Sequence, residues 1–142
     1  MTENVLVTIK GLQFDSADET VIEVINIGRF HQINNKIYLK YDELVENETR
    51  LTSNLIKIDG GSIEITKKGT VSTHMRFCAN EKTVSLYNTP FGSFSLGIFT
   101  RSVEIDKQED VINILIDYSL EVEEKQISDC KVGICIKTQD KA

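Results

Sequence analysis

The feature that most constrains this chain is the alternation of apolar and polar residues, which recurs with a period of two along its length. Side chains two residues apart lie on the same face of a β-strand, so the pattern predicts strands with one buried face. Residues 111–122 also fit a helical spacing in part, but their β-branched content favours a strand. Every second position there is apolar or aromatic: Ile112, Ile114, Ile116, Tyr118, Leu120 and Val122.

Polar and glycine-containing turns separate the alternating segments. We expect hairpins at Asn34-Asn35 and at Asp59-Gly60-Gly61, because asparagine and glycine tolerate positive φ. Gly28 lies inside a predicted strand and indicates a bulge or a sharp bend. The predicted strands cover residues 4–14, 20–32, 36–44, 49–58, 62–67, 70–78, 83–87, 93–100, 102–108, 111–122 and 128–138.

The number of strands and the length of their connections predict the fold class. About ten strands joined by tight turns are typical of an antiparallel sandwich or barrel. Short connections favour an up-and-down meander, and a meander with one apolar face removes its unpaired edges by closing on itself. We therefore expect an all-β protein, a closed antiparallel up-and-down (meander) β-barrel of about 8–10 strands, with residues 1–142 forming a single domain.

Composition excludes several functional classes. The net charge of −6 argues against nucleic-acid binding, which needs a basic surface. No apolar run is long enough for a membrane helix, and the N-terminus lacks the basic start of a signal peptide, so we expect a cytoplasmic protein. Cys78, Cys130 and Cys135 have neither zinc spacing nor nearby histidines, and we interpret them as small apolar side chains.

Several short motifs resemble those of the YwiB-like family of small bacterial proteins of unknown function. The resemblance implies a calycin-type, lipocalin-like barrel and no established activity. Where the family often has arginine before a turn glycine, this chain has Lys68, so no buried guanidinium is expected there. The motifs are Tyr41-Asp42-Glu43, Lys68-Gly69, Met75-x-Phe77, Tyr87-x-Thr89-Pro90-x-Gly92 and Tyr118-x-Leu120.

The motif around Pro90 is the most distinctive local sequence. Proline fixes φ and glycine permits a tight bend, so we interpret Thr89-Pro90-Phe91-Gly92 as a corner between two barrel strands. If Tyr87 and Phe91 point inward, this corner shapes one mouth of the barrel.

Candidate ligand-binding residues are those that the alternation places on the inner face. His74 and Arg76 share the opposite face from Met75 and Phe77, so we expect both outside. Arg101 alternates with Phe99 and Val103, and as an inner residue it would need a partner. The candidates for the interior are Tyr41, Met75, Phe77, Tyr87, Phe91, Arg101 and Tyr118.

Two functions remain open from the sequence. The first is a barrel that binds an apolar or amphipathic small molecule in its interior. The alternative is a structural or interaction protein whose interior is filled by its own side chains and which dimerises or binds a protein partner. We do not expect an enzyme, because no nucleophile–histidine–acid arrangement can be assembled, and no cofactor, metal or membrane contact is expected either.

Overall fold

The computed structural model describes residues 3–15, 18–44, 51–70, 72–123 and 125–139. Within these residues no helix is long and apolar enough to cross a membrane. Residues 49, 50 and 71, which we placed in strands, lie outside the described part of the chain. The strands are β1 (Asn4–Asp15), β2 (Asp18–Ile33), β3 (Lys36–Leu44), β4 (Leu51–Asp59), β5 (Ser62–Lys68), β6 (Ser72–Phe77), β7 (Lys82–Thr89), β8 (Gly92–Lys107), β9 (Val111–Val122) and β10 (Lys125–Thr138).

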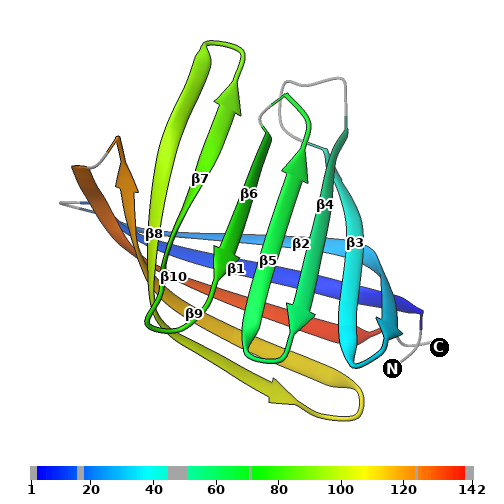
Figure 1. Cartoon of the computed structure of the whole chain (residues 1–142). Helices are drawn as coiled ribbons and strands as arrows, with labels where there is room; N and C mark the ends of the chain where they lie inside the picture. The colour runs from blue at the N-terminus through cyan, green and yellow to red at the C-terminus, as the bar shows by residue number, and fades with distance from the viewer. Residues whose placement is uncertain (1–2, 16–17, 45–50, 71, 124, 140–142) are drawn as a thin grey trace.

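The strands form a closed antiparallel barrel (Figure 1). Each strand pairs with its neighbour in the sequence, and β1 pairs with β10 to close the ring. The predicted all-β, up-and-down barrel is therefore confirmed. The two predicted hairpins are present, with positive φ at Asn34, Asn35 and Gly60.

Two walls of the barrel cross each other. In Figure 1, β3 to β7 run upright side by side, whereas β1, β2, β9 and β10 run across them. Strand β8 belongs to both walls, because it pairs first with β7 and then with β9. Its register shifts between Thr100 and Ser102, and a bulge of this kind lets a strand bend from one wall into the other. The predicted segments 93–100 and 102–108 are thus one bent strand.

Of the two predicted alternatives at Gly28, a bulge or a sharp bend, the bulge is absent, and the residue has a packing role. The β1–β2 register continues unbroken through it, and β2 begins to pair with β3 at the next residue. A Cβ atom at Gly28 would lie 3.0 Å from Val7 Cγ2 and 3.2 Å from Leu39 Cδ1. Glycine therefore allows β2 to approach these two side chains closely at the corner of the barrel.

The inner face is largely apolar. Its buried side chains come from both walls, as the alternation predicts. An edge-to-face contact between the rings of Phe77 and Tyr118, with centroids 5.0 Å apart, joins β6 to β9. The largest fully buried apolar side chains include Leu39, Ile56, Ile63, Phe77, Ile98, Ile112, Ile116, Ile134 and Ile136.

The wall is weakly closed between β6 and β7. Described pairs between these strands are Ser72 with Asn88 and Thr73 with Tyr87, near the upper end of the strands in Figure 1. Residues 74–77 and 83–86 form no register pairs with each other. A side-chain bond spans this seam, since the Thr83 hydroxyl donates to the Arg76 carbonyl oxygen at 2.8 Å.

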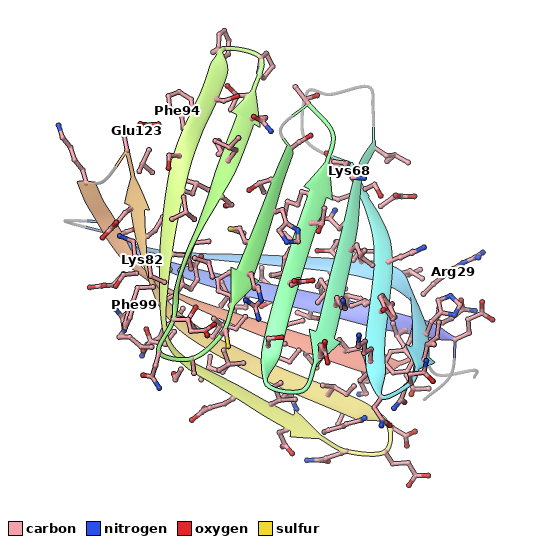
Figure 2. All side chains as sticks on the ribbon, in the orientation of Figure 1. Arg29, Lys68, Lys82, Phe94, Phe99 and Glu123 are labelled. Atoms are coloured by element: carbon pink, nitrogen blue, oxygen red, sulfur yellow. The ribbon has the colours of Figure 1, made fainter. Side chains whose placement is uncertain are left out.

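The β7–β8 hairpin rises above the rest of the upright wall (Figure 1). Toward its tip, Leu96 with Val122 is the last described pair between β8 and β9. Glu123 follows Val122 with a φ of 50°, and it bonds to Ser95, the residue of β8 next to Leu96. Its backbone N–H donates to the Ser95 carbonyl at 3.0 Å, and its carboxylate accepts from the Ser95 N–H at 2.7 Å (Figure 2).

Candidate functional site

A row of polar side chains crosses the upright wall on its inner face. Tyr41 pairs with Asn54, Asn54 with Lys67, Lys67 with Thr73, and Thr73 with Tyr87. Residues opposite each other in an antiparallel ladder share a face, so all five side chains project to the side of buried Tyr41 and Asn54. We call these five residues the polar row.

Three buried atoms of the polar row have no hydrogen-bond partner. They are the Tyr41 hydroxyl, the Asn54 Oδ1 and the Thr73 hydroxyl. The residues that carry them are only 4%, 1% and 7% exposed. Buried polar atoms in native proteins nearly always bond to protein, water or ligand, so three exceptions in one row make it a candidate binding site. The other such atoms in the described residues, on Asn26, Ser85, Thr100 and Thr138, lie outside the polar row.

Apolar side chains lie directly below the polar row. Two residues deeper along β3, β4, β5 and β6 are Leu39, Ile56, Ile65 and Met75, and these four also pair in register. All four pack in or against the hydrophobic core. The inner surface of this wall therefore changes from polar to apolar within one step of two residues.

An ion pair connects the polar row to the rim of the wall, because Lys67 of the row is paired with Glu43 near the end of β3. Lys67 Nζ is 3.5 Å from Glu43 Oε1. Because Glu43 pairs with Thr52 and Lys67 pairs with Asn54, this ion pair passes over β4 between those two residues. Burial raises the pKa of Tyr41, and the negative charge of Glu43 raises it further, so the Tyr41 hydroxyl stays protonated at neutral pH.

Most of the predicted interior residues face inward. Tyr41, Phe77 and Tyr118 are buried, and Met75 packs partly buried against them. Tyr87 is half-buried at the end of the polar row. Their proposed role in ligand binding stays a prediction.

Phe91 does not face the interior. It is 95% exposed at the tip of the β7–β8 hairpin. The Thr89 hydroxyl accepts from the Phe91 N–H at 3.1 Å and donates to the Gly92 carbonyl at 2.9 Å. These bonds, with a φ of 136° at Gly92, make the motif a tight hairpin turn, so it does not shape a mouth by inserting Phe91.

Arg101 also lies outside the barrel, contrary to the prediction. It occupies the bulge of β8, and the extra residue there lets Arg101 follow the outward face of Phe99 while Val103 turns inward. Its guanidinium bonds to Asp117 at 2.6 and 3.1 Å and to Asp129 at 3.1 Å. Arg101 therefore links three strands on the outer surface.

The outer position of His74 and Arg76 is confirmed. Both are exposed, and His74 Nδ1 bonds to the Thr66 hydroxyl at 2.8 Å. Among the residues that the structure describes, no group of three or more His, Cys, Asp or Glu side chains could hold a metal ion.

Sequence reasoning missed the centre of the site. Asn54, Lys67 and Thr73 were not candidates, although each occupies a position where its strand places apolar side chains two residues away. A polar residue at a buried position of an alternating strand was the available signal. What the sequence could not show is that strand register brings these residues into one row.

The fold and the site together define a class, the closed ten-stranded up-and-down β-barrel with a polar row inside one wall. The chain belongs to the family described as a domain of unknown function, DUF1934, whose model matches residues 7–134. It is 28% identical over 118 residues to the uncharacterised β-barrel protein YwiB of Bacillus subtilis strain 168, covering 83% of this chain and 82% of that protein. The predicted family resemblance is thereby confirmed.

One of two solved structures that resemble this chain shows the same fold. The crystal structure of the ywiB protein from Bacillus subtilis superposes with a TM-score of 0.85 at 23% identity, covering 97% of this chain and 93% of that one. An S-type phycobiliprotein lyase, CPES from Guillardia theta, gives a TM-score of 0.39 at 9% identity, covering 96% of this chain and 88% of that one. The second likeness is too low to support an argument.

Proposed function

We propose that the barrel binds a small amphipathic molecule in its interior. The polar end of the ligand bonds to the polar row, and its apolar part lies against Leu39, Ile56, Ile65 and Met75. The observation that carries this proposal is the set of three buried, unpartnered atoms on Tyr41, Asn54 and Thr73. Each such atom costs about 1–3 kcal/mol when left unbonded, and a ligand that bonds to them recovers that free energy.

The route of entry that we propose for the ligand lies beside β7. The inner side chains of this strand are Thr83, Ser85, Tyr87 and Thr89, and all four are half-buried instead of buried. They flank the weakly paired seam between β6 and β7. A ligand that enters there meets the polar row first. We propose that it is then held inside the barrel, as a single small ligand is held in lipocalins.

We propose a cytoplasmic binding protein and not an enzyme. Cys78, Cys130 and Cys135 are free thiols, which supports a reducing compartment. The polar row holds no histidine or cysteine, its Lys67 is paired with Glu43, and the raised pKa of its Tyr41 keeps that hydroxyl protonated, which supports binding over catalysis. The acidic surface supports partners other than nucleic acids or membranes.

The proposal is tested with a neutral fluorescent probe, N-phenyl-1-naphthylamine, and a matched pair of tryptophan variants. Ser85→Trp places a large ring on the inner face of β7, whereas Ser102→Trp places it on the exposed face of β8. We expect wild type and Ser102→Trp to bind the probe with one site, and Ser85→Trp to lose binding while circular dichroism shows that it is folded. Equal binding by both variants would place the probe outside the barrel.

Native mass spectrometry of the protein purified from its own source provides a second test. We expect a discrete mass adduct of a small molecule that is lost on denaturation. A protein free of adducts that also fails to bind the probe would contradict an interior binding site.

A second candidate function is self-association through the outer surface. Ile25 and Ile27 on the outer face of β2 are 62% and 63% exposed, which is unusual for isoleucine in a strand. We propose that this face forms a homodimer contact if the interior proves to be filled. Sedimentation equilibrium of wild type and Ile27→Lys tests it: a monomeric wild type at high concentration excludes this candidate.

A further inference from the structure

We infer that the ligand carries an uncharged polar head with a hydrogen-bond donor, such as a hydroxyl or a primary amide, on an apolar chain. This inference rests on the proposed function and adds the chemistry of the ligand head. It follows from the direction of the bonds in the polar row and from the state of the charges around it.

Asn54 sets the need for a donor. Its Nδ2 donates to the carbonyl oxygen of Thr52 at 3.2 Å. Because a carbonyl oxygen only accepts, the amide nitrogen must face Thr52, and the acceptor Oδ1 is left without a partner. With the residue only 1% exposed, a ligand N–H or O–H is the group that satisfies this atom.

Tyr41 and Thr73 complete the set of bonding groups. Both are hydroxyls, so each donates one hydrogen bond and also accepts. They lie on strands to either side of Asn54 in the register of the wall. A head group that both donates and accepts suits Asn54 and Tyr41, which are direct register partners, as an alcohol or an amide does; Thr73 lies two strands from Asn54 along the polar row.

The charges at the rim argue against an ionised head. Lys67 is already paired with Glu43, and the pair crosses the same strand that carries Asn54. A carboxylate would have to replace Glu43 at Lys67 and would also face the acceptor Oδ1 of Asn54. An ammonium would satisfy Asn54 but would lie beside Lys67, and either ion would lose its hydration on burial.

The experiment compares ligands of one chain length and different heads at about pH 7.5, where decanoate is ionised and decylamine is protonated. The ligands are 1-decanol, decyl methyl ether, decanoate and decylamine. Binding is followed by displacement of N-phenyl-1-naphthylamine and by native mass spectrometry. We expect 1-decanol to bind about ten-fold more tightly than each of the other three, because the ether lacks a donor and the ions carry charge.

Variants assign the preference to the polar row. In Asn54→Leu we expect the affinity for 1-decanol to fall about ten-fold, to that of the ether, while the affinity for the ether is unchanged. Tyr41→Phe should reduce the same preference, whereas Tyr38→Phe, on the opposite face of β3, should not. Asn113→Leu, on the exposed face of β9, is the matched control for Asn54→Leu.

The outcomes separate the two proposals. If no decyl compound binds wild type, amphiphile binding itself is wrong. If decanoate or decylamine binds as tightly as 1-decanol, the barrel binds amphiphiles but the head is not restricted to uncharged donors. If 1-decanol and the ether bind equally, the donor requirement is wrong. Thermal unfolding of every variant confirms that a loss of binding is not a loss of fold.

Discussion

Strands β7 and β9 both alternate between inward-facing and outward-facing side chains, but the inward-facing side chains of the two strands differ in polarity and burial. The inner face of β9 presents Ile112, Ile114 and Ile116, all buried, and continues to the buried Tyr118. The inner face of β7 presents Thr83, Ser85, Tyr87 and Thr89, all half-buried. Both strands lie in the same closed sheet, separated by β8 alone.

The difference shows that two strands of one barrel contribute unequally to its apolar core. The inner face of β9 buries branched apolar side chains and contributes to the free energy that holds the ring closed, as do the buried side chains of β3 to β6. The wall that ends at β7 also carries polar side chains and incomplete pairing, features that cost stability. Variants in each wall test this difference.

The largest effect is expected in the apolar wall. Ile116→Ala removes a fully buried side chain of β9 and should lower the free energy of unfolding by about 2–5 kcal/mol. Urea unfolding followed by circular dichroism measures the change. The matched change Val84→Ala, at an exposed position of β7, should stay within about 0.5 kcal/mol. If Ile116→Ala lowered the free energy of unfolding by less than Val84→Ala does, the inner face of β9 would not contribute the stability expected of it.

A smaller loss is expected at the rim of the polar wall. A Cβ atom on Gly69 would lie 2.5 Å from the Thr52 Oγ1, so Gly69→Ala should destabilise by about 1–3 kcal/mol. Because the clash is with a side-chain atom, adding Thr52→Ala should recover part of the loss in chemical denaturation. Gly61→Ala, which meets no atom within 4 Å, is the control. No recovery in the double variant would mean that the backbone, and not Thr52, opposes the new methyl group.

The seam between β6 and β7 should respond more weakly. Thr83→Val removes the hydroxyl that donates to the Arg76 carbonyl, and we expect a loss of about 0.5–1.5 kcal/mol. The expected signature is local: amide hydrogen exchange should accelerate in β6 and β7 and stay unchanged in β9. Faster exchange in every strand would instead indicate that the seam and the apolar wall open together.

A further expected effect is one of pH, and it has the same direction in both walls. Burial raises the pKa of Tyr41 and of Tyr118, and nearby Glu43 and Cys130 respectively raise them further. Both folded pKa values exceed the ordinary value of about 10. The stabilisation is therefore fully present below about pH 10 and is lost as the pH rises through the folded values.

Absorbance of tyrosinate measures this titration. We expect part of the signal to appear only at a pH well above that of free tyrosine, together with alkaline unfolding. Tyr41→Phe and Tyr118→Phe should each remove a share of the late signal. Four tyrosines that titrate together in the folded protein would show that neither side chain is buried as described.

The sequence predicted the architecture well because the alternation survives in almost every strand. The bounds of β3 and β9 agree with the predicted 36–44 and 111–122. Arg101 was wrongly predicted to face the interior because a bulge shifts the inward–outward alternation of β8 by one residue. No residue type in the sequence indicates that shift. Phe91 was wrongly predicted to face the interior because it lies in the two-residue turn between β7 and β8, where the alternation of the strands does not apply.

The candidate site was predicted only in part, for a different physical reason. Tyr41 and Tyr87 were recognised at the two ends of the polar row, but the residues between them depend on the pairing of four strands. Register arises from the whole barrel and cannot be derived from any one strand. Arrays of polar atoms across a sheet are therefore a property that the structure adds.

The contacts of Glu123 with Ser95 have a consequence for how molecules of this protein meet one another. A strand edge with free N–H and C=O groups is a template on which a second chain can add a strand, and this is a common start of aggregation. Glu123 occupies both groups of Ser95 at the end of the β8–β9 pairing, and it puts a negative charge there. Glu123, which directly follows β9, thus leaves neither backbone group of Ser95 free to pair with a strand of another molecule.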